Sequence, residues 1–269
     1  MKQLNKVRGI GVACLAACAV LLASPAAAFT NLLFTGPGSG CSPNSTGNIS
    51  GSRTCTSDGV TSVAKAYAFT GDPGNNVVQG AYLGLWGGGL GVQHRDSEGV
   101  ESTSSPQHSL DNKDRFEMVW LDFGSKVVLD EVKIGWMEND SDITVLAYVS
   151  GTSDPSGKSI SGGTLSGWSV VGHYDGDDIG QGNQSSAIRT IDINGGGTSS
   201  QFWLIGAYNP NFSGPAESGV DWDGYKVVDY LKLYAVSGHS PPGVPEPGSL
   251  ALVSLAFGGL WRARRAKRS

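Results

Sequence analysis

The chain has 269 residues, 40 of them glycine, with a formal net charge of −5 and only 16% charged side chains. This length excludes a disulfide-stapled mini-protein and is sufficient for one all-β domain with its own core. Both ends have the composition of targeting segments, so the fold and charge of the body have to be considered without them.

Residues 1–28 have the pattern of a secretory signal peptide. Three basic residues lie within the first eight positions, the apolar run Ile10–Ala23 follows, and alanines at 26–28 offer a small-residue cleavage site before Phe29. This order predicts export and removal of the segment. Two alternatives stay open: an uncleaved membrane anchor, and a lipoprotein signal, because the residues before Cys18 are similar to a lipobox.

Removing the two ends changes the charge of the body. Three basic residues leave with residues 1–28, five leave with residues 262–269, and one acid, Glu246, also lies outside the body. The body therefore keeps 11 basic and 23 acidic residues, a net charge near −12. Such an acidic surface excludes nucleic-acid binding by charge attraction and is compatible with binding divalent cations.

Export also leaves two cysteines, Cys41 and Cys55, at the ends of a polar loop. An exported chain is folded in an oxidising compartment, so the sequence predicts a disulfide between them.

The body, residues 29–238, is expected to form a single all-β domain, an antiparallel β-sandwich or jelly roll. Apolar runs alternate with Gly/Asp/Asn/Ser turns, and no amphipathic helical window is convincing. The run 116–123 is apolar on both faces, which is typical of a central strand. The glycine-rich part 29–105 is expected to supply outer strands and an irregular flap. Further strands are expected within 61–71, 126–137, 142–151, 167–176, 201–210 and 227–238.

Strict alternation predicts which side chains share a face. Trp136 is expected with Val132 and Ile134, Val149 with Val145, and Tyr174 with Trp168. The succession of strands from 121 to 238 resembles the galactose-binding-like jelly roll of discoidin-type and carbohydrate-binding modules. That resemblance implies a fold and no particular ligand.

The C-terminus combines three features in a fixed order. A proline-rich linker, 239–247, holds Val244, Pro245, Glu246 and Pro247. The apolar run 248–261 follows, and the basic tail 262–269 would stay in the cytoplasm. A helix over the apolar run is about 21 Å long, which is short for a hydrocarbon core of about 30 Å. A transient membrane segment is therefore expected, with an ordinary short membrane helix as the alternative.

These features resemble the PEP-CTERM sorting signal of Gram-negative bacteria. The resemblance implies recognition and cleavage by an exosortase, delivery to the outer surface or extracellular matrix, and a host that makes extracellular polysaccharide. Part of the body resembles a set of PEP-CTERM proteins described only as exosortase-dependent surface proteins. The stretches that carry this resemblance are His108 to Asn112, the expected strand 116–123, the tripeptide 134–136 and Asp140 to Asp142.

The sequence does not indicate an enzyme. Motifs of serine hydrolases and zinc proteases are missing, and adjacency of His108 and Ser109 is not the geometry of a catalytic triad. Acidic pairs occur throughout the turns, so they do not indicate a glycosidase.

A structural calcium ion is the only cofactor that the sequence suggests, because calcium prefers several oxygen ligands from short loops. The candidate ligands lie in two acidic loops and are Asp140, Asp142, Asp175, Asp177 and Asp178. Their spacing does not match an EF-hand, and solvated acidic turns are the alternative.

Sugar binding would use exposed aromatic faces beside polar groups. Trp222, between Asp221 and Asp223, is the preferred candidate, with Trp86, Trp168, Trp203, Tyr208 and Tyr225 as others, whereas Trp120 and Trp136 are expected in the core. His108 and Asp111 are candidate ligand contacts, with turn capping by Asp111 and Asn112 as the alternative.

The sequence therefore predicts a non-catalytic, exosortase-processed surface or matrix protein, associated with exopolysaccharide. A carbohydrate-binding module and a secreted hydrolase are the alternatives.

Overall fold

A computed structural model describes residues 28–35, 40–43, 50–70, 77–96, 99–101, 106, 108–221 and 228–241. All of them belong to one unit of the chain, Ala26–Pro241. Regular structure in this part is entirely β, which confirms the predicted class, and the strand pairings are antiparallel. No helix in the described ranges has the length and apolar character needed to cross a membrane. The signal peptide, the sorting motif, the short apolar segment and the basic tail lie outside the described residues.

The first part of the chain, which was expected to supply outer strands and an irregular flap, forms strands over most of its described residues. Its strands are β1 (Ala28–Leu33), β2 (Cys41–Ser42), β3 (Ser52–Ser57), β4 (Val60–Thr70), β5 (Val77–Trp86), β6 (Gly89–Gln93), β7 (Arg95–Asp96) and β8 (Gly99–Val100). Strands β3 and β4 are joined by Asp58 and Gly59, both at positive φ. Asp-Gly favours this two-residue turn because its twist matches that of the flanking strands.

The remaining strands follow the order that alternation predicts. They are β9 (Leu110–Asp111), β10 (Glu117–Asn139), β11 (Ile143–Tyr148), β12 (Ile160–Ser161), β13 (Thr164–Leu165), β14 (Trp168–Tyr174), β15 (Gly180–Ser185), β16 (Arg189–Asp192), β17 (Ser199–Ala207) and β18 (Asp229–His239).

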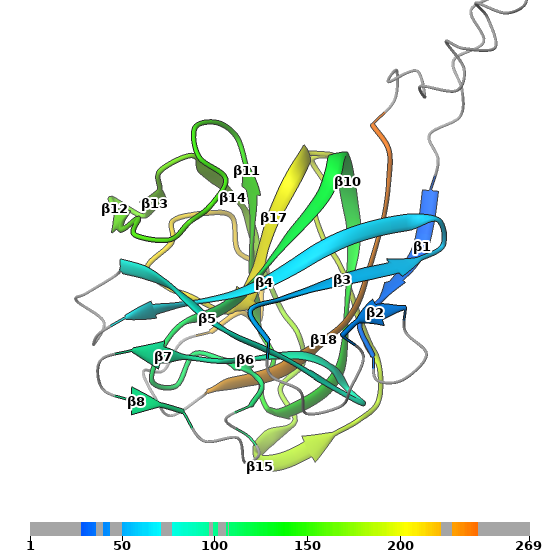
Figure 1. Ribbon diagram of the computed structural model, residues 1–269. Helices are drawn as coiled ribbons and strands as arrows, with labels where there is room; N and C mark the ends of the chain where they lie inside the picture. The colour runs from blue at the N-terminus through cyan, green and yellow to red at the C-terminus, as the bar shows by residue number, and fades with distance from the viewer. Residues whose placement is uncertain are drawn as a thin grey trace, which may run out of the picture. The chain divides into compact units, whose positions relative to one another are not determined.

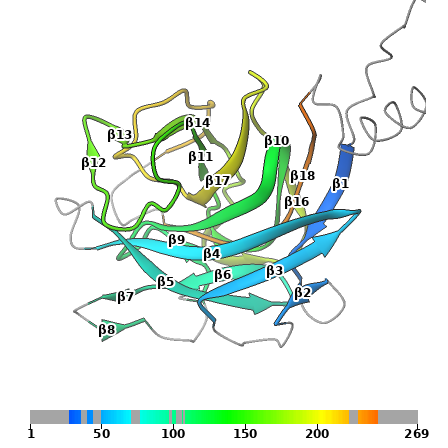
Figure 2. The ribbon, with the colours of Figure 1, turned by 45° about the horizontal axis from the view of Figure 1, so that its top comes forward.

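Strand β10 is long and pairs with different strands along its two halves (Figures 1 and 2). Its first half pairs with β4 and β17, and its second half pairs with β18, β15 and β16. Further pairings of β18 with β6, β6 with β5 and β5 with β4 return to β10. The pairings thus close a ring, with β17, β11 and β14 added beside the first half of β10.

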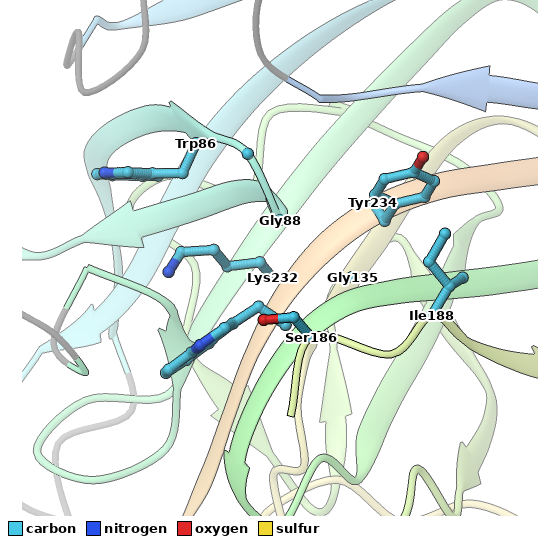
Figure 3. A pocket seen from close by; sticks show the side chains of 9 residues that line it. Trp86, Gly88, Gly135, Ser186, Ile188, Lys232 and Tyr234 are labelled. Carbon is cyan, nitrogen blue, oxygen red and sulfur yellow. The ribbon is translucent and has the colours of Figure 1, made fainter. Parts of the chain in front are cut away.

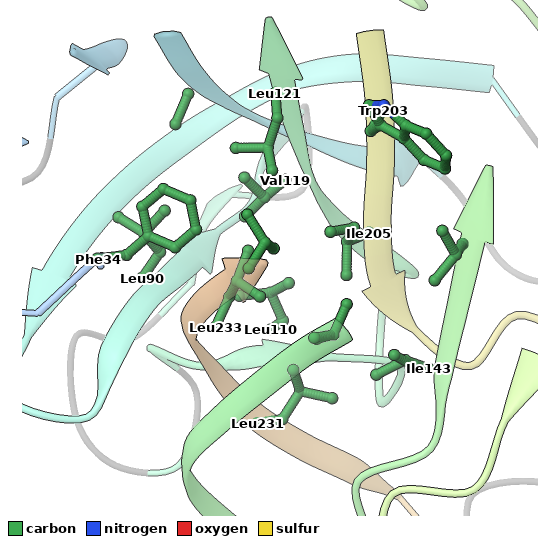
Figure 4. Packing of buried hydrophobic residues seen from close by; sticks show 14 of the residues in the cluster. Phe34, Leu90, Leu110, Val119, Leu121, Ile143, Trp203, Ile205, Leu231 and Leu233 are labelled. Atoms are coloured by element: carbon green, nitrogen blue, oxygen red, sulfur yellow. The ribbon is translucent and has the colours of Figure 1, made fainter. Parts of the chain in front are cut away.

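The prediction that residues 116–123 form a strand buried on both faces is confirmed. Val119, Leu121 and Phe123 face the main core, which contains side chains from β4, β5, β6, β11, β17 and β18 (Figure 4). Met118 and Trp120 face a second cluster with Tyr67, Phe69, Trp168 and Phe212. The sheet around this half of β10 is therefore covered on both sides.

Three predictions about faces are wrong, and irregular strands explain the first two. In β10, Ile134 pairs with Leu233 and Trp136 with Lys232, so Gly135 is an extra residue and Trp136 leaves the core face. A similar irregularity in β14 puts Tyr174 in the main core, opposite Trp168.

Val149 is the third case. Strand β11 ends at Tyr148, and Val149 is 64% exposed. The alternation that predicted its burial therefore does not extend past the end of the strand.

The predicted disulfide is present. Cys41 and Cys55 are bonded and buried, and they face each other across the β2–β3 pair.

Candidate functional site

Three buried aspartates meet where β10 ends and β18 begins. We call Asp140, Asp142 and Asp229 the acidic junction. Each offers a carboxylate oxygen, and these oxygens all lie within 4.8 Å of one another. All three residues are at most 4% exposed. A buried set of three carboxylates is an unusual arrangement, because each anion loses its hydration on burial.

The carboxylates also hold loops together. Asp142 Oδ1 accepts from the Gly176 N–H at 3.0 Å, and Oδ2 accepts from the Asp221 N–H at 3.0 Å. Asp229 Oδ1 accepts from the Asp142 N–H at 2.8 Å, and Asn112 donates its side-chain amide to Oδ2 of Asp229. The groups that donate to these carboxylates therefore come from four separate chain segments, around residues 112, 142, 176 and 221.

Burial sets the electrostatics of the junction. It raises the pKa of Asp140 to about 7, with repulsion from Asp142 as the next cause, and raises the pKa of Asp142 to about 6. The pKa of Asp229 is well above its ordinary value, first through burial and then through repulsion from Asp140 and Asp142. The site therefore favours a bound cation or proton over three free anions.

The structure brings together part of the predicted calcium set. Asp140 and Asp142 are members of the junction, and Asp229 is a member that sequence reasoning missed. Asp178 and Asp175 lie close enough for their charges to raise the pKa of Asp140 and Asp142, respectively. The carboxylate of Asp177 is not part of this set, because it approaches Arg189 at 4.0 Å on the surface.

A second candidate site is a cavity of about 460 Å³ beside β10 and β18. Its walls come from the β5–β6 turn, β10, β18 and the segment between β15 and β16 (Figure 3). We call it the aromatic pocket; its lining is Trp86, Gly87, Gly88, Gly135, Trp136, Ser186, Ile188, Lys232 and Tyr234. The two tryptophans and Tyr234 are partly exposed, and Ile188 is 54% exposed.

Lys232 lies between the two tryptophans. Its Nζ is 4.1 Å from the centroid of the Trp136 ring and 5.6 Å from that of Trp86. The His108 ring packs against Trp86 at a centroid distance of 4.7 Å, tilted by 51°, and its Nε2 shares a hydrogen bond of 3.2 Å with Lys232 Nζ. These contacts fix the orientation of both indole rings at the pocket wall.

Two glycines allow the walls to approach each other. A Cβ on Gly135 would lie 2.5 Å from the Gly88 carbonyl oxygen, and one on Gly88 would lie 2.7 Å from Cβ of Trp136. Only glycine lets the β5–β6 turn pack this closely against β10.

The aromatic predictions have mixed outcomes. Trp86 lines the pocket, whereas the prediction of Trp136 as a core residue is wrong because of the bulge at Gly135. Trp120 is buried as predicted, but Trp168 and Trp203, suggested for sugar binding, are also buried. Tyr208 is partly buried. Trp222, Asp223 and Tyr225 lie outside the described residues, and Asp221 contributes its backbone N–H to the acidic junction.

The two candidate contacts before β10 have different positions. His108 contacts the wall of the aromatic pocket from behind Trp86 and Lys232. Asp111 is buried, and its Oδ1 accepts from the Lys113 N–H at 3.1 Å. This is the turn capping that the sequence offered as the alternative.

Comparisons with known proteins assign no family: no family model, no curated protein and no solved structure matches this chain.

Proposed function

We propose that this chain is an exported, exosortase-processed protein of the cell surface or extracellular matrix. Its body would bind extracellular polysaccharide through the aromatic pocket and catalyse no reaction. In this proposal the sandwich is a jelly roll of the galactose-binding type, used as a carbohydrate-binding module. The sequence features that support delivery are the signal peptide and the motif Val244-Pro245-Glu246-Pro247 with its apolar and basic followers.

The aromatic pocket is the observation that carries the binding proposal. Sugar rings present C–H faces that pack on indole and phenol rings, and hydroxyl groups that need polar partners. Trp86, Trp136 and Tyr234 supply partly exposed rings, and Ser186 supplies a hydroxyl beside them. The pocket is also preorganised, because Lys232 and the two glycines hold its walls.

The composition of the pocket also supports a binding role over hydrolysis. The described residues that line it include no histidine and no carboxylate. A glycosidase needs two carboxyl groups across the scissile bond, and a serine hydrolase needs a base beside its nucleophile.

A structural calcium ion at the acidic junction belongs to the same proposal. The junction offers three carboxylates, and calcium binds oxygen ligands at 2.3–2.6 Å in variable geometry. Bound there, the ion would neutralise the buried charge and link the end of β10 to the start of β18.

The test of binding is a comparison of the exported protein with its Trp136→Ala variant on exopolysaccharide from the host, by affinity electrophoresis or calorimetry. We expect the variant to lose more than about tenfold in affinity, which corresponds to about 1.4 kcal/mol. A second variant, Trp222→Ala, tests the residue that the sequence favoured and should retain binding if the pocket is the site. Equal binding by the native protein and the Trp136→Ala variant would contradict the assignment of the pocket.

Delivery has a separate test. The intact mass of the protein recovered from the host envelope and medium should correspond to a chain that begins at Phe29 and ends near Pro245–Pro247. A mass that retains residues 261–269 would contradict exosortase processing and leave the polysaccharide test unaffected.

A further inference from the structure

A second group of ionisable side chains lies apart from the acidic junction in the sequence, between β6 and the start of β10. His94 Nδ1 is 3.3 Å from Glu101 Oε2 and 3.5 Å from Glu117 Oε1. These three ligand atoms lie within 4.8 Å of one another. Unlike the acidic junction, this group combines an imidazole nitrogen with carboxylate oxygens.

The spacing of these atoms suits a small metal ion. Zinc binds imidazole nitrogen and carboxylate oxygen at about 2.0–2.2 Å, so ligand atoms around a tetrahedral ion lie about 3.4 Å apart. The distances from His94 to the two glutamates bracket that value. The backbone also orients Glu117, because its Oε1 accepts from the His94 N–H at 3.0 Å and its Oε2 from the Asp111 N–H at 3.3 Å.

Asp111 provides an independent indication of a ligand. It is 2% exposed, and its Oδ2 is buried without a hydrogen-bond partner in the structure. Burial is the main cause that raises the pKa of Glu117, and repulsion from Asp111 is the next. Burial likewise raises the pKa of Asp111, followed by repulsion from Glu101. The three carboxylates are therefore close neighbours, and one of them has a free oxygen in the protein interior.

Charge balance favours a divalent ion at this position. Glu117 is fully buried and the side chain of Glu101 is 6% exposed, so neither carboxylate is well hydrated. His94 contributes at most one positive charge against three carboxyl groups. An unpaired anion in the interior is costly, and a metal ion would neutralise the carboxylates that bind it.

We propose that His94, Glu101 and Glu117 bind one first-row divalent metal ion, for which zinc is the best match, with Asp111 as a neighbouring buried carboxyl group. Imidazole favours zinc over calcium and magnesium, which prefer oxygen ligands only. The ion would fasten the chain around Glu101 to the start of β10. This inference is independent of the proposed polysaccharide binding.

The test uses the untagged exported protein, stripped of metal and saturated with calcium so that the acidic junction is occupied. Titration with zinc chloride in a calorimeter should show one zinc ion per chain with release of protons, because the ligands must be deprotonated. Cobalt(II) on the same protein should give the visible absorption of a low-symmetry site, and x-ray absorption of the zinc form should show an imidazole ligand.

Two variants locate the ion. Glu101→Gln and His94→Gln should each weaken zinc binding by more than about tenfold, whereas Asp192→Asn, an exposed acid on β16, should leave it unchanged. Circular dichroism establishes whether each variant is folded. If a variant does not fold, the cobalt spectrum of the native protein tests the site in its place.

Three results would overturn the proposal: no zinc uptake by the native protein, zinc binding unchanged in both folded ligand variants, or a zinc site without an imidazole ligand. In the first case the carboxyl groups share protons in place of a metal. None of these readouts involves polysaccharide, so failure here is distinguishable from failure of the proposed function.

Discussion

The backbone N–H of Asp142 donates to Oδ1 of Asp229 at 2.8 Å, although 87 residues separate them in the chain. This bond joins the segment after β10 to the first residue of β18. Asp142 in turn accepts from the N–H groups of Gly176 and Asp221. The acidic junction is therefore both the proposed calcium site and the point where several loops depend on one another.

Calcium should stabilise the native protein through this junction. At a calcium concentration of 100 times the dissociation constant, the free energy of unfolding should rise by about 2.7 kcal/mol, because only the folded chain assembles the site. Thermal unfolding with calcium and with EDTA measures this difference. Asp142→Asn should abolish the response, and Asp192→Asn, an exposed acid on β16, should retain it. A full response in folded Asp142→Asn would place the ion elsewhere.

Two tryptophans should separate stability from binding. Trp203 is fully buried in the main core, so Trp203→Ala should lower the free energy of unfolding by about 3–5 kcal/mol. Trp136→Ala should lower it much less, because this ring lies at the pocket wall, yet it should remove polysaccharide binding. Urea unfolding and affinity electrophoresis on both variants check the contrast. Similar losses of stability in the two variants would contradict the surface position of Trp136.

Gly135→Ala should disturb the aromatic pocket directly. The new Cβ would lie 2.5 Å from the Gly88 carbonyl oxygen, so the β5–β6 turn has to move away from β10. Overpacking of this kind costs about 1–3 kcal/mol. Gly196→Ala is the matched control, since a Cβ there meets no atom within 4 Å. Urea unfolding should show the loss for the first variant alone.

Because of Lys232, the free energy of unfolding should change with pH in the alkaline range. Burial lowers the pKa of Lys232 to about 8, with the charge of Glu138 opposing the shift, and His108 is the other ionisable group that contacts it. Below pH 8 the ammonium group is charged in both states and the full cost of burying it is present. Between pH 8 and 10.5 the unfolded chain binds more protons than the folded one, so the cost falls as the pH rises.

Lys232→Met should therefore be more stable than the native protein at pH 7, by roughly 1–3 kcal/mol. This gain should shrink between pH 8 and 10.5. Unfolding by urea at pH 7, 9 and 10.5 measures it, with Lys126→Met on the exposed part of β10 as the control. A gain that stays constant with pH would mean that burial does not shift the pKa of Lys232.

The disulfide should contribute to stability through the unfolded state. It joins two cysteines that are 14 positions apart in the sequence, and the chain-entropy model predicts about 3 kcal/mol for a loop of this size. The double variant Cys41→Ser/Cys55→Ser should unfold at correspondingly lower urea concentration. An unchanged midpoint would show that the loop is already restricted in the unfolded chain.

Local pattern alone was sufficient for much of the fold. The period-two alternation of apolar residues predicted the β class, and the double-sided apolar run 116–123 predicted a strand buried on both faces. Two cysteines in a body that was expected to be exported predicted the disulfide. Each of these features depends on residues close in sequence or on composition, where strand geometry and solvent exclusion act directly.

Only the tertiary structure decided where the sites lie. Asp229 joins Asp140 and Asp142 because β18 pairs with β10 along its length, and no local signal encodes that pairing. Trp136 reaches the pocket because one extra residue, Gly135, reverses the face that alternation assigns to it. His94 meets Glu101 and Glu117 through packing between segments that alternation treats separately. Side chains far apart in sequence are brought together by strand register and bulges, and those depend on the packing of the whole core.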